Sequence, residues 1–149
     1  MREHIAVWFV AACALSIGAV QPAPASTCAG AFSVRMPDGW RTADRLMLVV
    51  ADVSVPKNRT AVLEFHAAAG NETAMLGSYG VVAESTTAAG TSTFEVMRVN
   101  VTRQLRRWLD AHPGSTVCIR VIPVDGSQRP IADLGWTSRT IEIQAVRDP

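Results

Sequence analysis

The stretch TAVLEFHA, residues 60–67, decides the fold class, because its larger apolar side chains fall on every second residue. Leu63 and Phe65 share one face of an extended chain, whereas Glu64 and His66 share the other. This period of two predicts a half-exposed strand with Leu63 and Phe65 turned inward. The preceding stretch LMLVVADVSV, residues 46–55, is apolar and β-branched and stops at Pro56, so it predicts a second strand with a buried first half.

Further strands are predicted downstream. They cover residues 75–83, 93–101, 116–124 and 137–146. Gly77 and Gly80 interrupt the first of these segments and favour a bulge or a close backbone approach there. The segment between the second and third predicts a helix over residues 103–111, with Thr102 as its N-cap. Leu105, Trp108 and Leu109 form its apolar face, and residues 113–114, Pro-Gly, stop it.

These elements together predict a mainly β protein. Six or so strands, regularly spaced turns and one short helix indicate an antiparallel, jelly-roll-like β-sandwich with a crossover helix near residues 103–111. The chain of 149 residues has a net charge of only +1, with no basic stripe or acidic tail. We therefore expect a single domain and no binding to nucleic acid.

The N-terminus predicts export. Residues 5–20 are apolar or small, Pro22 ends any helix, and residues 23–25, Ala-Pro-Ala, suit a signal peptidase. Residues 1–25 are thus predicted to be a cleavable signal peptide, and residues 26–149 to be one secreted or periplasmic domain. A membrane anchor is the competing interpretation, but the apolar run is shorter than the roughly 20 residues that a span needs. Cys13 ends a lipobox-like VAAC, which leaves lipoprotein processing as a minor alternative.

Cysteine usage agrees with export. Cys28 and Cys118 are the two cysteines left after cleavage, an even pair in an oxidising compartment. We predict a disulfide between them, with two buried free thiols as the alternative.

The search for catalytic or metal-binding groups is mostly negative. Only His66 and His112 remain after cleavage, and both are interpreted as surface or cap histidines. The chain has no nucleophile elbow, phosphate-binding loop, carboxylate pair or calcium loop. We therefore expect no catalytic residues, no metal, no cofactor and no enzymatic activity.

Two weaker features concern binding. Trp40 and Trp136 fall in predicted loops, where they either pack at an edge or stack against a sugar. Asn58, Asn71 and Asn100 each begin an N-x-T sequon, which a eukaryotic secretory pathway would glycosylate. The sequence leaves their use open.

The order of segments resembles the C-terminal domain of polyphenol oxidases and tyrosinase-like proteins. The resemblance rests on five segments in this order: an F-containing strand, a Gly-Ser-aromatic strand, a strand running into a Leu-containing helix, a proline-ending strand and a last alternating strand. In this sequence they read VLEFHA (62–67), MLGSYGVV (75–82), VMRVNVTRQLRRWL (96–109), VCIRVIPVDG (117–126) and RTIEIQAV (139–146). The chain departs from the plant form at residues 64–67, which are EFHA in place of Lys-Phe-Asp-Val.

In that family the resembling domain is a β-sandwich that covers the copper site and can keep the enzyme latent. No copper-binding domain is attached in this sequence. The resemblance therefore implies an exported accessory or interaction domain, without chemistry of its own, whose partner is a tyrosinase-like copper oxidase or another exported protein. Tyr79 is the candidate residue for insertion into a partner, with core packing as the alternative. A carbohydrate- or cell-envelope-binding module using Trp40 and Trp136 is the second functional hypothesis.

Overall fold

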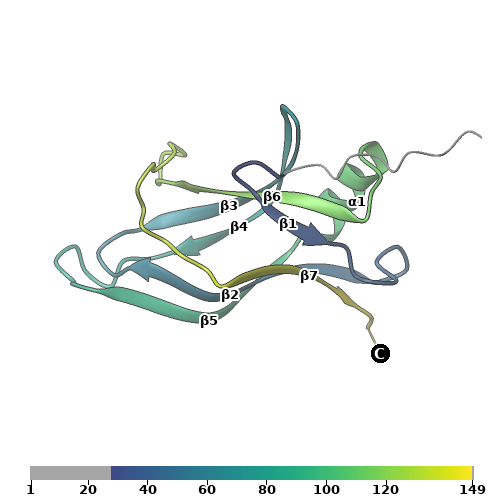
Figure 1. The fold of residues 1–149 in the computed structure, drawn as a ribbon. Helices are drawn as coiled ribbons and strands as arrows, with labels where there is room; N and C mark the ends of the chain where they lie inside the picture. Colours follow the sequence, from purple (N-terminus) through teal and green to yellow (C-terminus); the bar gives the residue numbers. More distant parts are fainter. Residues whose placement is uncertain (1–27, 149) are drawn as a thin grey trace, which may run out of the picture.

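The computed structural model describes residues 28–148, which form two antiparallel β-sheets and one short helix (Figure 1). The strands are β1 (Phe32–Arg35), β2 (Arg45–Pro56), β3 (Ala61–Ala69), β4 (Glu72–Val81), β5 (Thr91–Asn100), β6 (Thr116–Val124) and β7 (Thr140–Val146), and the helix is α1 (Thr102–Ala111). One sheet, sheet A, has the order β1-β6-β3-β4, and the other, sheet B, has the order β5-β2-β7. The prediction of a mainly β, antiparallel sandwich with one short helix is confirmed.

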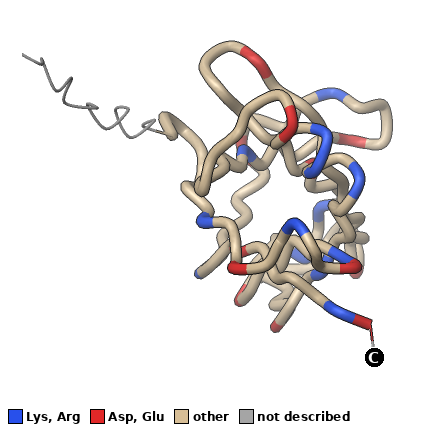
Figure 2. The backbone as a smooth tube through the Cα atoms, turned by 90° about the vertical axis from the view of Figure 1, so that its right-hand side faces the viewer, with Lys and Arg blue, Asp and Glu red and all other residues tan. Residues whose placement is uncertain are grey.

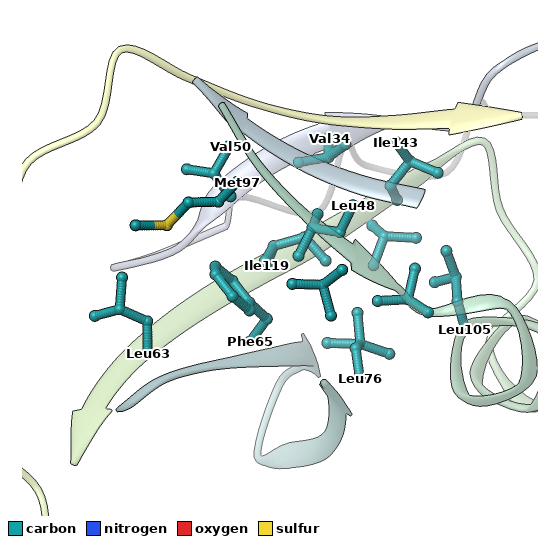
Figure 3. Packing of buried hydrophobic residues seen from close by; sticks show 14 of the residues in the cluster. Val34, Leu48, Val50, Leu63, Phe65, Leu76, Met97, Leu105, Ile119 and Ile143 are labelled. Carbon is teal, nitrogen blue, oxygen red and sulfur yellow. The ribbon is translucent and has the colours of Figure 1, made fainter. Parts of the chain in front are cut away.

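The core lies between the two sheets, where side chains from both meet (Figure 3). Leu63 and Phe65 of β3 are completely buried, as the alternation in this strand predicts. Leu48 and Val50 of β2 reach the same core from sheet B and are also fully buried. The two stretches that decided the fold class therefore supply the centre of each sheet.

The helix closes one end of the sandwich. Leu105, Trp108 and Leu109 are its buried residues, as their spacing predicts. Contacts with β2 and β4 fix the helix against both sheets. The apolar stripe thus explains why this short helix is stable in the fold.

The predicted N-cap is wrong by one residue. Val101 is the N-cap of α1, and Thr102 is the first helical residue. The Thr102 hydroxyl accepts a hydrogen bond from the Leu46 N–H at 2.8 Å and donates one to Asn100 Oδ1 at 2.7 Å. Asn100 Oδ1 also accepts from the Thr102 N–H at 3.1 Å, so a residue of β5 satisfies this free N–H. Thr102 joins the helix start to β2 instead of capping it.

Other boundaries differ from the sequence-based prediction. Strand β1 was not predicted, because its four residues are too few to show a period. Strand β4 begins at Glu72, three residues before the predicted start at residue 75, since β3 and β4 form a hairpin with a two-residue turn at residues 70–71. Strand β7 begins at Thr140, three residues late, although Thr137 still pairs with Ser54 through two hydrogen bonds of 2.9 Å.

The surface carries both signs of charge. Figure 2 shows Lys and Arg interspersed with Asp and Glu along the backbone of the face it presents. Within residues 28–148 no helix is both long enough and apolar enough to cross a membrane. The predicted signal peptide, residues 1–25, and Cys13 within it lie outside the described residues.

Candidate functional site

A groove of about 460 Å³ lies where the β3–β4 hairpin, the end of α1 and the start of β6 meet. Small residues, Ala68 to Gly70 of the hairpin with Ala29 and Ala31, form much of its wall. Such side chains leave the backbone accessible, so another chain can approach closely. The groove is therefore suited to an extended segment.

The end of α1 supplies the aromatic wall of the groove. Trp108 and His112 are four residues apart and so lie on one side of the helix. Their rings stack with centroids 3.9 Å apart and planes 18° from parallel. His112 is the C-cap residue, as the cap interpretation predicts, and its N–H donates to the Trp108 carbonyl oxygen at 2.8 Å. Its Nε2 atom lies 2.9 Å from Glu72 Oε2 on the hairpin, which ties helix and hairpin together.

A disulfide forms the third wall, and it confirms the predicted pairing of Cys28 with Cys118. Cys118 lies on β6 opposite Ser33 of β1 and Ala68 of β3. It points to the outer face of sheet A, because its neighbours Val117 and Ile119 are buried in the core. The bridge therefore holds the chain before β1 against the outside of this sheet.

Arg120 adds a positive charge to the groove. It lies two residues after Cys118 on the same outer face and opposite His66 of β3. His66 is paired with Glu64 at 3.0 Å, and both side chains are less than one-fifth exposed. The outer face thus carries a partly covered imidazole–carboxylate contact beside a guanidinium group that lines the groove.

The two histidines of the described chain each contact a glutamate. His66 contacts Glu64 and His112 contacts Glu72, so the two histidines have different partners. Among residues 28–148 no three His, Cys, Asp or Glu side chains form a group that could hold a metal ion.

The structure places Trp40 and Trp136 on different loops at opposite ends of β1. Trp40 lies in the loop after β1, with the Arg41 guanidinium 4.5 Å from its ring centroid. Trp136 lies in the loop before β7 and contacts Phe32, the first residue of β1, at 6.4 Å between ring centroids. Both indoles are half-buried, and each belongs to a separate surface.

Tyr79 packs against the core from β4. It pairs with Leu63, which faces inward, and its ring meets that of Phe94 edge-on at 6.5 Å between centroids. Asn58, Asn71 and Asn100, which begin the sequons, are all exposed.

The groove was not predicted from the sequence. Two features of the sequence are consistent with it in hindsight. Trp108 and His112 are four residues apart just before the helix stop, and Cys118 and Arg120 share one face of a strand. Neither feature says that the hairpin at residues 70–71 lies beside them.

No family model matches the chain, and no curated protein is a significant match to it.

Proposed function

We propose that the chain is an exported β-sandwich that acts by binding another protein, and that the groove receives an extended segment of this partner. The observation that carries the proposal is the groove itself, a concave surface with small-residue walls, one aromatic wall and one guanidinium group. Concave sites with a few placed polar groups are the usual form of a binding site. A tyrosinase-like copper oxidase is the first partner to test, because the segment order resembles the domain that covers the copper site in that family.

The chemistry of the groove indicates what the segment carries. Trp108 offers an apolar surface in the aromatic wall, although only 8% of this residue is exposed. Arg120 is half-buried and pairs well with a carboxylate, because its guanidinium presents several donors in one plane. An extended segment with an apolar residue followed by Asp or Glu fits both features.

Export is part of the proposal. The disulfide needs an oxidising compartment, and residues 1–25 have the order of a signal peptide. Export predicts a secreted or periplasmic chain that begins at Ser26 and contains no free thiol. Mass spectrometry of the cell fractions tests both points, and a full-length chain in the cytoplasm contradicts them.

Binding is tested with a tyrosinase-like oxidase from the same organism. Ala69 is exposed and lines the groove, so Ala69→Trp fills the groove without disturbing the core. Ala89 is equally exposed but lies in the loop between β4 and β5, so Ala89→Trp is the matched control. We expect wild type and Ala89→Trp to bind the oxidase and alter its latency or copper loading, and Ala69→Trp to lose both effects.

Two outcomes contradict this proposal. An oxidase that neither binds the wild-type chain nor changes in its presence removes the oxidase as partner. Equal binding by Ala69→Trp and Ala89→Trp removes the groove as the site.

A second function has one observation in its favour. Trp40 borders a separate hollow of about 380 Å³ that also contains Asp38 and Arg41. An aromatic ring beside charged side chains is a common arrangement for stacking and hydrogen bonding a sugar. Retention on cell-envelope polysaccharide that Trp40→Ala abolishes and Trp136→Ala preserves would support this function, and no retention of the wild type would remove it.

A further inference from the structure

The Cys28–Cys118 disulfide lies in the wall of the groove, where a molecule that enters the groove can reach it. Both cysteines line the groove, and both are half-buried. On the outer face of sheet A, the strand neighbours of Cys118 are Ser33 of β1 and Ala68 of β3. Their side chains are too short to cover the sulfur atoms, so the bridge is accessible to a reagent in the groove.

The chain on the Cys28 side of the bridge is a short surface turn. The Ala31 N–H donates to the Cys28 carbonyl oxygen at 3.1 Å, and Gly30 between them has a φ of +65°. Ala29 and Gly30 are exposed, so this turn lies on the sheet without entering the core. Cys28 therefore belongs to a segment that can move when the bridge opens.

Cys118 belongs to a fixed strand. Strand β6 lies between β1 and β3 in sheet A, and Cys118 is paired with a residue of each neighbour. It stays in place when the bridge opens. The two sulfur atoms thus have different surroundings, and they are not equivalent as targets of a thiol.

The charge of the groove favours an anion at Cys118. Arg120 is the charged residue of β6, and it follows Cys118 by two residues on the same face. Glu64 and Glu72 each contact a histidine, and neither lines the groove. A guanidinium group beside a cysteine stabilises the thiolate, which makes that sulfur the better leaving group in disulfide exchange.

We propose that this bridge is a reactive disulfide, which a thiol in the groove opens while the protein stays folded. The incoming thiolate attacks Cys28 Sγ and forms a mixed disulfide with it. The electron pair of the broken bond stays on Cys118, which becomes a thiolate beside Arg120. A second thiolate of the same partner then attacks the partner's sulfur in the mixed disulfide and releases Cys28. Two electrons thus pass to the bridge, the partner's two thiols become a disulfide, and Cys28 and Cys118 take up the protons that these thiols lost.

The class of thiol follows from the charge of the groove. Arg120 attracts an anionic thiol, such as a cysteine flanked by Asp or Glu, and repels a cationic one. This reaction uses the groove of the proposed function but goes beyond it, because it needs a thiol and no oxidase.

Reduction by mercaptopropionate without urea tests whether the folded protein reacts. The new thiols are counted by mass spectrometry after maleimide labelling. Ile143→Val trims the core from the opposite sheet, so a reaction that requires unfolding should become roughly two- to tenfold faster in this variant. We expect equal rates in wild type and Ile143→Val. A wild type that is not reduced, or a faster reaction in the variant, would overturn the proposal.

Two tryptophan variants test entry through the groove with the same thiol. Ala69→Trp fills the groove and should lose most of the reaction, whereas Ala89→Trp lies outside it and should keep the wild-type rate. Equal rates in the two variants would overturn entry through the groove. No oxidase is present, so this result is independent of whether an oxidase binds.

Charge selectivity is tested by comparing mercaptopropionate, which is anionic, with cysteamine, which is cationic. The ratio of the two rates should fall roughly two- to fivefold in Arg120→Gln and stay near the wild-type value in Arg120→Lys. Arg98→Gln is the matched control, because Arg98 is exposed on β5 of the other sheet. The same ratio in Arg120→Gln and Arg98→Gln would overturn the role of Arg120.

Peptide mapping of the early product identifies the sulfur that is attacked. After quenching in acid and labelling with maleimide, we expect mercaptopropionate on Cys28 and maleimide on Cys118. The opposite pattern would overturn the assignment of Cys118 as the leaving sulfur.

Discussion

Gly77 on β4 approaches Val99 on β5 so closely that a Cβ atom on the glycine would lie 2.6 Å from Val99 Cγ1. This contact joins the edge of sheet A to the edge of sheet B, at the bulge that the glycine-rich sequence of β4 predicts. A close approach of two edge strands therefore depends on a missing side chain.

Substitution of Gly77 by alanine should destabilise the fold. The added methyl group meets a β-branched side chain in the closed edge, and such overpacking costs about 1–3 kcal/mol. Gly80→Ala is the matched control, because a Cβ there would have no neighbour within 4 Å. Urea unfolding of the two variants measures the difference, and equal midpoints would contradict the close packing of β4 on β5.

The disulfide should contribute substantially to stability. Its two cysteines are 90 residues apart, and removal of a native bridge from a small exported domain typically costs about 2–5 kcal/mol. The double variant Cys28→Ser/Cys118→Ser should unfold at a lower urea concentration than wild type, and its unfolding midpoint should not change when a reductant is added. Reduction of the wild type should give a similar midpoint, whereas no change on reduction would mean that the bridge is absent in solution.

The two phenylalanines Phe65 and Phe32 should differ in their tolerance of truncation. Phe65 is fully buried between the sheets, and Phe→Ala at such a site costs about 3–5 kcal/mol through lost burial and a cavity. Phe32 is 40% exposed, so Phe32→Ala should cost roughly half as much or less. Equal losses in unfolding free energy would contradict the assignment of Phe65 to the core.

The carboxylate of Asp125 should make the free energy of unfolding decrease in acid. The N–H groups of Arg129 and Ser127 donate to its carboxylate at 3.0 and 2.8 Å and lower its pKa from the ordinary value of 3.8. A lowered folded pKa gives stability that is present above the ordinary pKa and lost as pH falls through the folded pKa. Asp125→Asn should therefore be less stable than wild type at neutral pH, and the difference should shrink at pH values below the folded pKa.

Arg129→Ala separates the causes of this pH dependence. The largest cause is the backbone N–H of Arg129, which an alanine keeps, whereas the guanidinium contributes less. Arg129→Ala should therefore retain most of the acid sensitivity in urea unfolding. A variant as insensitive to pH as Asp125→Asn would assign the effect to the ion pair instead.

Local sequence was sufficient to predict the mainly β class and the helix, but not the short strand β1 or the contact that Thr102 makes with β2. Phe65 and Leu105 were assigned correctly, since a period of two and a period of 3.6 are both visible in short windows. Strand β1 was missed because its four residues are ordered by pairing with β6, far away in sequence. Thr102 was misplaced by one residue for a similar reason, since β2 supplies the group that its hydroxyl binds.

The groove was beyond sequence reasoning, whereas the disulfide was not. Two cysteines in an exported chain predict each other without any knowledge of the fold. The groove requires that Gly70, His112 and Arg120 come together from a hairpin, a helix end and a strand. Sequence spacing gives the neighbours within one element but not the neighbours across three.

The Cys28–Cys118 bridge also determines how the domain would respond to a pulling force. Tension applied through the chain before Cys28 passes through the sulfur atoms directly into β6 and on to β7. Residues 29–117 are enclosed in a covalent loop and carry none of this load while the bridge is intact. The short strand β1 cannot be peeled from its edge first, so a tether at the N-terminus would extend only the last part of the chain until a reductant opens the loop.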